Sequence, residues 1–305
     1  MLSISTAWNA GTTSGVNEML SGIKKAGFKA IEVGYGFSPE KLEELRSLAG
    51  AMGIRIVSVH NYCPLPSSSP KRNKHPADYY SFSSQDKEER KSAVENTKLT
   101  IDTAKWLSAE AVVIHAGTVE LKQDYAGRLM RLYRENKRDS GEYNAVKEEF
   151  LKARQENKKP YVDSVAESLD KVLSYAVKAG IKIGLETRYY PHEIPDFGEI
   201  GYFLKLSHGK GLYYWHDAGH AEVNERLGIM PHSAFLESYS DNLLGMHIHD
   251  LTGIDDHKAP FTGDLDFSKI KPYLARTPLK VIEAHYDAAS AGMTEADIAM
   301  KLNGE

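Results

Sequence analysis

The 305-residue chain lacks several features that would assign it to a class at once. It contains one cysteine, Cys63, which excludes an internal disulfide and fits a reducing compartment. No apolar run approaches the roughly 20 residues of a membrane-spanning helix. The N-terminal residues MLSISTAWNA lack the basic start and apolar core of a signal peptide. GxGxxG, Walker A and GxSxG motifs are also absent, which argues against nucleotide cofactors and serine hydrolysis. We therefore expect a cytoplasmic protein that does not act at a membrane.

An excess of charge of one sign is missing as well. The 38 Lys and Arg residues are balanced by 42 Asp and Glu residues, which gives a net charge of −4. No global positive field attracts nucleic acid, although a local basic groove remains compatible with DNA. Hydrophobic residues make up 41% and charged residues 26% of the chain, as in soluble globular domains. A small-molecule partner is therefore favoured over nucleic acid, and a homo-oligomer is compatible with the sequence.

Short runs rich in apolar and β-branched residues recur along the whole chain. Their continuous rather than alternating apolar character predicts strands that are covered on both faces, as in a parallel sheet. The predicted strands are Leu2–Trp8, Ala30–Tyr35, Ile54–His60, Ala111–His115, Ile181–Glu186, Gly211–His216, Leu243–His249 and Leu279–Ala284. Helical periodicity lies between them, for example over Lys41–Met52, after Ser38-Pro39, and over Asp163–Ala179, with Gly180 placed to end it.

Eight strands alternating with helices predict a (β/α)8 TIM barrel formed by residues 1–305 as a single domain. An open doubly wound sheet is the alternative. Two connections are too long for a simple helix, residues 63–90 after the third strand and residues 118–160 after the fourth. Because both follow strands, they should rise over the face of the barrel that carries active sites.

Polar side chains of metal-ligand type stand at the ends of the later strands. In a barrel these ends converge on the C-terminal mouth. Carboxylates gathered there repel one another and need a counter-charge, and histidine with Asp or Glu suits zinc, manganese, iron or cobalt. A lone histidine at a strand end is more often structural, and Asp217 to His220 can be a simple turn, so the prediction rests on the set. The candidate ligands are His60, His115, Glu186, Asp217, His220, His247, Asp255, His257 and Glu283.

Three other residues are candidates for contact with a substrate. Arg188 follows Glu186 closely and could bind a phosphate or carboxylate at the rim, or form a surface salt bridge. Trp8 could pack against a sugar face or plug the barrel end. His249, beside His247, is the third predicted substrate-binding residue. Cys63 shows no catalytic pattern and is expected to be inert.

The motifs at the strand ends resemble those of the xylose isomerase-like TIM-barrel superfamily. They are VSVH at Val57–His60, VVIHAG at Val112–Gly117, LET at Leu185–Thr187, HDAGH at His216–His220, MHIHD at Met246–Asp250, DDH and FTGDLDF within Asp255–Phe267, and IEAH at Ile282–His285. The resemblance covers nearly the whole chain except the two insertions. That superfamily contains metal-dependent sugar and sugar-phosphate isomerases and epimerases, and also the zinc nuclease endonuclease IV.

The resemblance implies ligand sets by motif position. Glu186, Asp217, His247 and Glu283 are similar to the single-metal site of the isomerase branch. The remaining candidates match the further zinc ligands of the nuclease branch: His60, His115, His220, Asp255 and His257.

Two chemistries follow, and they need different numbers of metal ions. An isomerase or epimerase moves a proton through a metal-stabilised enediolate, with Glu186 and Glu283 as the proton-exchanging carboxylates. A multinuclear zinc phosphoesterase of the endonuclease IV type would use two or three ions to activate hydroxide and hold the phosphate. We expect the isomerase or epimerase, acting on a sugar or sugar phosphate with one to three divalent ions. A non-enzymatic metal- or ligand-binding protein is the third alternative.

Overall fold

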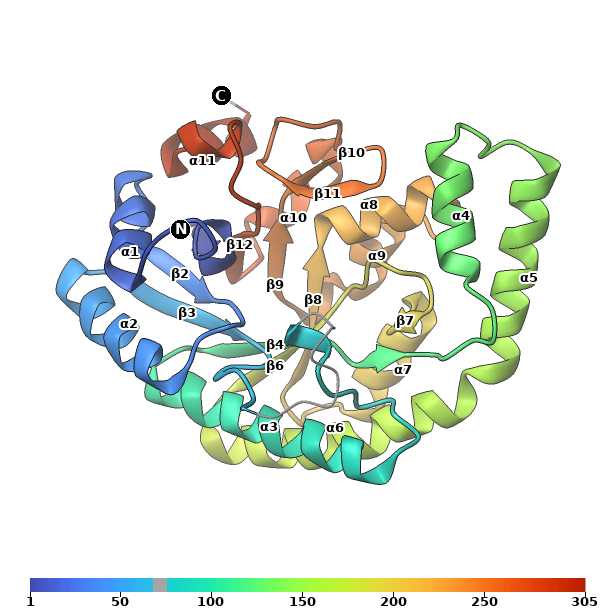
Figure 1. The fold of residues 1–305 in the computed structure, drawn as a ribbon, viewed down its shortest axis with the longest axis horizontal. Coiled ribbons are helices and arrows are strands. Elements are labelled where there is room, and N and C mark those ends of the chain that lie inside the picture. The colour runs from blue at the N-terminus through green and yellow to red at the C-terminus, as the bar shows by residue number, and fades with distance from the viewer. Residues whose placement is uncertain (68–75, 305) are drawn as a thin grey trace.

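A closed barrel of eight parallel strands forms the centre of the protein (Figure 1). The computed structural model describes residues 1–67 and 76–304. The barrel strands are β1 (Ser3–Ser5), β2 (Ala30–Val33), β3 (Arg55–His60), β4 (Ala111–Ile114), β6 (Lys182–Glu186), β8 (Leu212–Asp217), β9 (Leu243–Ile248) and β12 (Leu279–Ile282). They pair in the order β1-β12-β9-β8-β6-β4-β3-β2, with β2 closing on β1. The predicted (β/α)8 barrel is thus confirmed, and the open sheet is excluded.

Helices surround the barrel. They are α1 (Val16–Lys25), α2 (Pro39–Met52), α3 (Lys87–Trp106), α4 (Tyr125–Arg134), α5 (Gly141–Asn157), α6 (Lys159–Ala179), α7 (Phe197–Leu206), α8 (Ala218–Arg226), α9 (His232–Tyr239), α10 (Lys271–Leu274) and α11 (Glu295–Asn303). Short 3-10 turns lie at Thr6–Trp8, Pro76–Asp78, Ser240–Asn242, Phe267–Lys269 and Ser290–Gly292. Helix α6 ends at Gly180, whose φ of +75° is the left-handed conformation that glycine adopts freely.

The first strand is shorter than the sequence predicted. Residues Leu2–Trp8 were expected to be extended, but the strand stops at Ser5 and a 3-10 turn follows. The Ser5 hydroxyl accepts a hydrogen bond from the Ala7 backbone N–H at 3.3 Å, and the Thr6 hydroxyl accepts one from the Gly34 N–H at 2.9 Å. Such side-chain bonds to the backbone compete with the strand ladder and favour a turn.

The two predicted insertions differ in structure. The connection after β3 reaches α3 through the turn at Pro76–Asp78. The connection after β4 folds into α4 and α5, which pack side by side at one flank of the barrel (Figure 1). Two small antiparallel sheets lie outside the barrel, β5 (Gly117–Thr118) with β7 (Glu193–Ile194) and β10 (Asp250–Thr252) with β11 (Asp255–Lys258).

The barrel interior is filled around Trp215. This fully buried side chain belongs to a small apolar cluster with residues from other barrel strands, among them Val113, Leu244 and Val281. A Cβ atom added at Gly245 would lie 2.2 Å from the Trp215 ring, so glycine on the adjacent strand makes room for the indole. The His247 ring also packs against Trp215, with ring centroids 5.2 Å apart. Within the described residues, no helix is long and apolar enough to cross a membrane.

Candidate metal centre

Four side chains from neighbouring strands form a buried group that we call the strand-end cluster. Glu186 ends β6, Asp217 ends β8, His247 lies in β9 and Glu283 follows β12. The parallel register places Asp217 directly opposite His247, and the Glu283 N–H donates to Ile248 O at 3.2 Å. One ligand-type atom of each side chain lies within 4.8 Å of those of the others. The strands therefore assemble the four predicted isomerase-type ligands.

The contacts inside the strand-end cluster converge on one nitrogen. His247 Nδ1 is 2.7 Å from Glu186 Oε1, 3.0 Å from Glu283 Oε2 and 3.6 Å from Asp217 Oδ2. Asp217 Oδ2 is fully buried, yet it accepts no hydrogen bond. A buried acceptor without a donor is costly, and three carboxylates around one imidazole are a donor set suited to a divalent cation. The strand-end cluster thus fits a metal ion.

Burial and the neighbouring charges shift the pKa values of the side chains in the strand-end cluster. Burial alone raises the pKa of a carboxyl group. The imidazoles nevertheless hold the pKa of Glu186, beside His115, and of Asp217, beside His220 and His249, well below their ordinary values. His247 likewise outweighs burial at Glu283 and lowers its pKa to about 2. Burial lowers the pKa of an imidazole, but Glu283 and Glu32 raise the pKa of His247 well above its ordinary value. The carboxylates are therefore ionised at neutral pH, and His247 holds a proton that a bound cation would replace.

His60 and His115, which we call the outer pair, lie near Oε2 of Glu186, whereas His247 contacts Oε1. His115 Nε2 lies 2.8 Å and His60 Nε2 3.7 Å from Glu186 Oε2. The same oxygen also accepts a hydrogen bond from Arg188 Nη1 at 2.9 Å. Arg188 is buried and donates through Nη2 to Glu193 Oε1 at 2.8 Å. A second cation bound by the outer pair and Glu186 would have to lie beside this oxygen. The positive charge of Arg188 already occupies that position.

Arg188 thus differs from its predicted place. The sequence suggested an arginine at the rim or in a surface salt bridge, whereas its side chain is only 7% exposed. The pairing follows from local structure, because Glu193 lies at the start of β7 and its Oε2 also accepts from the Tyr190 N–H.

Most of the imidazoles at the mouth are oriented by a second oxygen atom. His60 Nδ1 is 3.0 Å from Asn61 O, His115 Nδ1 3.4 Å from Asp78 Oδ1, and His220 Nδ1 2.9 Å from Thr187 O. His247 Nε2 is 3.0 Å from Glu32 Oε1. In each ring, one N–H donates outward and the other nitrogen is turned toward the acidic groups, which is the usual orientation of metal-binding histidines.

A second group, the loop cluster, consists of His220, Asp256 and His257. Asp256 Oδ2 lies 3.4 Å from His220 Nε2, and Asp256 Oδ1 lies 3.1 Å from His257 Nδ1. His220 stands in the first turn of α8, where the Asp217 carboxylate caps the helix by accepting the His220 N–H at 2.7 Å. Burial lowers the pKa of His220, but Asp217 and Asp256 raise it to about 9. The loop cluster is therefore a second candidate for a cation, with one carboxylate instead of three.

Asp255, the predicted ligand beside His257, does not join the loop cluster. In a regular strand, alternate side chains share a face, which would have placed Asp255 with His257. His257 instead has a left-handed φ of +55°, and this turn brings Asp256 into the group. Asp255 is 68% exposed and pairs with Arg134 at 2.9 Å.

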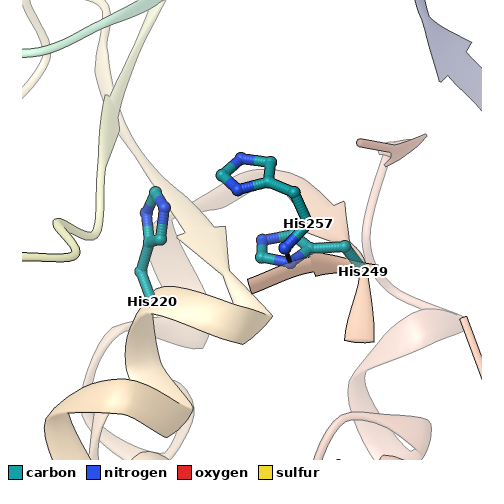
Figure 2. Close-up of side chains that lie close together, drawn as sticks. All are labelled: His220, His249 and His257. Atoms are coloured by element: carbon teal, nitrogen blue, oxygen red, sulfur yellow. Dashed lines mark hydrogen bonds between the residues drawn. The ribbon is translucent and has the colours of Figure 1, made fainter. Parts of the chain in front are cut away.

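His249 lies beneath the ring of His257 (Figure 2), and both of its ring nitrogens are hydrogen-bonded. Its Nδ1 accepts a hydrogen bond from the His257 backbone N–H at 3.0 Å, and its Nε2 donates to Asp217 Oδ1 at 2.9 Å. The His249 and His257 rings stack with centroids 4.5 Å apart. His249 is fully buried and does not line the cavity of the site. The structure thus places it as a bridge between the two clusters rather than in the predicted contact with substrate, although its nitrogens also lie close enough to those of His220 and His257 for ligation.

A cavity of about 670 Å³ opens over the strand-end cluster. Both insertions contribute to its wall, the first through Asp78 and the second through Met130 and Arg134 in α4. The wall also includes Glu186 and Glu283, the outer pair, His220, His257, Arg188, Tyr35, Tyr189, Tyr190 and His285. The site is therefore accessible to a small molecule.

Trp8 faces a different cavity. It lines a neighbouring space of about 500 Å³ beside α1 and packs against Tyr286, with ring centroids 5.6 Å apart. Trp8 is not among the residues that line the main cavity. This position does not support the predicted contact with a sugar.

Two carboxylates of the site were missed in the sequence. Glu32 is fully buried in the middle of β2, whereas the predicted ligands lie at strand ends or in the segments that follow them. Its signal was a lone charged residue inside the apolar run AIEVGY. Asp256 was missed because the motif position assigned the ligand to its neighbour Asp255.

Comparison with known proteins gives one family match and several structural likenesses. A family model described as a xylose isomerase-like TIM barrel matches residues 20–300. The uncharacterized protein y4fM of Sinorhizobium fredii (strain NBRC 101917 / NGR234) is 25% identical over 290 residues, which are 87% of this chain and 80% of that protein.

Among solved structures, 3-keto-D-glucoside 4-epimerase from E. coli is similar with a TM-score of 0.68 and 14% identity, over 100% of this chain and 99% of that chain. D-Psicose 3-epimerase from Clostridium cellulolyticum H10, solved with D-tagatose, has a TM-score of 0.65 and 15% identity, over 95% of this chain and 87% of that chain. At these identities the likeness establishes the fold.

Proposed function

The chain belongs to the xylose isomerase-like TIM-barrel family, and from that premise we propose that it is a divalent-metal-dependent isomerase or epimerase of a sugar or sugar phosphate. One observation carries the proposal. Glu186 and Glu283 both line the cavity and both contact Nδ1 of His247. Two carboxylates beside a cation-binding group are what the exchange of a proton at a carbon next to a carbonyl requires.

The strand-end cluster would hold the ion, whether zinc, manganese, cobalt or iron, through Glu186, Asp217, His247 and Glu283. A bound divalent ion would stabilise the negative charge that develops on the substrate oxygens when the proton leaves carbon. The structural relatives named as sugar epimerases support this assignment by fold, and the donor set supports it by chemistry.

Glu186 and Glu283 would carry the proton. Their lowered pKa values make both of them carboxylates at neutral pH, so either one can begin as the base. If one carboxylate takes the proton and the other returns one, the configuration at that carbon inverts. If a single carboxylate takes the proton from one carbon and returns it to the former carbonyl carbon, while the hydroxyl proton passes between the two oxygens, the carbonyl moves along the chain. These two outcomes separate an epimerase from an isomerase.

Arg188 favours one ion over several. Its guanidinium lies 2.9 Å from the Glu186 oxygen that the outer pair also faces, and like charges repel strongly at a buried site. The outer pair is then left to contact substrate oxygens. Among the described residues of the cavity wall, the arginines Arg134 and Arg188 are each paired with a carboxylate, which favours a hydroxyl-rich sugar over a phosphate ester.

A second candidate is the multinuclear zinc phosphoesterase. The observation in its favour is that, within residues 1–67 and 76–304, ligand-type side chains form three groups: the strand-end cluster, the outer pair with Glu186, and His220 with His249 and His257. Phosphoester chemistry would need ions in at least two of these groups.

Counting metal ions and assaying both reactions tests the proposal. The purified protein is analysed for zinc, manganese, cobalt and iron, then assayed on a panel of ketoses and on a duplex with an abasic site. We expect one tightly bound ion and interconversion of a ketose, which is lost in Glu283→Gln. Three bound ions with strand cleavage and no change in any sugar would replace the proposal by the second candidate. That the partner is a small sugar or sugar phosphate is part of the same proposal. The cytoplasmic location and the single-domain organisation stay predictions.

A further inference from the structure

Glu32 is a buried carboxylate in the interior of the barrel. It lies in the middle of β2, and its side chain is fully buried. Its Oε2 accepts a hydrogen bond from the Ser58 hydroxyl of β3 at 2.7 Å, and its Oε1 lies 3.0 Å from His247 Nε2 of β9. An ionisable side chain in such a place is costly unless its oxygens are bonded. Its two bonded oxygens therefore matter more than its contribution to packing.

His247 has two edges with different partners. Nδ1 faces Glu186, Asp217 and Glu283, while Nε2 faces Glu32. Rotation of the ring by half a turn would exchange nitrogens with carbons, so Glu32 would lose its donor and the cluster would lose its nitrogen. The Trp215 ring packs edge-on against the imidazole. This apolar contact does not distinguish the two ring orientations, so the hydrogen bond to Glu32 selects between them.

We propose that Glu32 is a positioning residue that holds the Nδ1 lone pair of His247 toward the cation site, with Ser58 fixing Glu32 in turn. The hydrogen bond from Nε2–H to Glu32 Oε1 selects both the orientation of the ring and the nitrogen that binds. The proposal rests on the proposed metal-dependent function, since it assigns Glu32 to the same site. Glu32 itself is not expected to touch substrate.

The test measures binding of the metal alone. Zinc and manganese affinities are determined by competition with a chromophoric chelator for the wild type, Glu32→Met and Glu32→Gln. Methionine preserves volume but cannot accept the hydrogen bond, and we expect its affinity to fall by about 10–100-fold, as for other lost outer partners of metal ligands. Glutamine can still accept from Nε2–H through its amide oxygen while its amide nitrogen faces Ser58, so E32Q should retain most of the affinity.

Glu199→Met is the matched control. Glu199 is also a buried glutamate with a nitrogen partner, Arg154 at 2.8 Å, but it lies outside the strand-end cluster. Its loss should lower the melting temperature without changing the affinity for the cation. If Glu32→Met behaved like Glu199→Met, the role of Glu32 would be structural only and the proposal would be wrong.

A measurement on the wild-type protein covers the case in which Glu32→Met does not fold. In zinc-loaded protein with 15N-labelled histidine, long-range 1H–15N spectra distinguish a metal-bound nitrogen from a protonated one, and His247→Gln assigns the signal. We expect Nδ1 bound and Nε2 protonated. Zinc on Nε2 would overturn the proposal while leaving the proposed function intact. A wild-type protein that binds no cation would overturn both.

Discussion

The strand-end cluster and the loop cluster lie at the same mouth, yet their backbones differ. Glu186, Asp217, His247 and Glu283 come from four consecutive members of the closed sheet, whose register fixes their spacing. The loop cluster instead combines the first turn of α8 with the β10–β11 hairpin, and its geometry depends on a left-handed φ at His257. Backbone outliers of this kind persist only where the surroundings hold them.

The two clusters differ in backbone rigidity and in negative charge. The sheet brings three carboxylates to one nitrogen, whereas the hairpin brings one carboxylate between two imidazoles. Because affinity for a divalent cation grows with the number of fixed anionic ligands, the strand-end cluster should bind first and most tightly. His249 connects the two clusters through Asp217 and the His257 backbone.

Loss of a strand-end ligand should have the largest effect. Asp217→Ala removes a carboxylate ligand and the cap of α8. Loss of an outer hydrogen-bond partner of a metal ligand lowers affinity by up to about 100-fold, and we expect the loss of a direct ligand to lower cation affinity further. Asp217→Asn retains the cap and should lose nearly as much affinity, which separates ligation from folding. Asp255→Ala is the matched control and should bind normally. Full metal content in Asp217→Ala by elemental analysis would contradict the assignment.

Arg188→Met should alter both stability and the number of ions. Removing one partner of a buried ion pair costs about 3–5 kcal/mol, because Glu186 and Glu193 are left with an uncompensated charge. We expect the melting temperature of the metal-free variant to fall and excess zinc to restore it by occupying the outer pair with Glu186. Metal analysis should then give one more ion than in the wild type. An unchanged count would show that Arg188 does not exclude a second cation.

Asp256 and Asp255 form a matched pair that tests the loop cluster. Asp256→Ala leaves Nε2 of the buried His220 without its carboxylate partner, which should cost about 1–3 kcal/mol. Asp255→Ala removes only an exposed ion pair with Arg134 and should cost less than about 1 kcal/mol. Chemical denaturation of the metal-free proteins measures both values. A larger effect of Asp255→Ala would restore the predicted ligand and refute the assignment of Asp256.

Gly219 tests the packing that connects the clusters. A Cβ atom at this position in α8 would lie 2.0 Å from Cε1 of the His249 ring. We therefore expect Gly219→Ala to destabilise the protein by about 1–3 kcal/mol through overpacking. Gly50 in α2 has open space around it, so Gly50→Ala should stabilise the helix by about 0.5–1 kcal/mol. Opposite signs in thermal melts confirm the close approach, and equal effects would contradict it.

The metal-free protein should lose stability as the pH rises from 6.5 to 9. The pKa of His220 is raised to about 9, so its contribution is complete below the unfolded value of 6.5 and disappears as the pH rises through 9. The low pKa of Glu283 places its contribution above about pH 4.5, with loss only as the pH falls toward 2. We expect a decline of roughly 2–4 °C for each kcal/mol lost.

Excess zinc should reverse this trend, because cation binding gains as protons leave the histidines. Differential scanning fluorimetry with chelator and with zinc compares the two directly. A metal-free melting temperature that rose toward pH 9 would contradict the charge arrangement.

The same difference between sheet and hairpin explains which site residues could be predicted from the sequence. Parallel strands bring their carboxyl ends together, so apolar runs ending in Glu186, Asp217 and His247 were enough to predict a shared site. The hairpin was not predictable in this way, because one left-handed residue at His257 exchanges Asp255 for Asp256. Glu32 was missed for a different reason. It lies inside a strand, and only the closed barrel shows that the middle of β2 faces the ring of His247.

Anomalous diffraction from metal-loaded crystals is the most direct test of the central claim, that one divalent cation is held by the strand-end cluster. The account predicts a single strong peak at about 2.0–2.2 Å from oxygens of Glu186, Asp217 and Glu283 and from Nδ1 of His247. A peak confined to the outer pair or to the loop cluster, with the strand-end cluster empty, would contradict it.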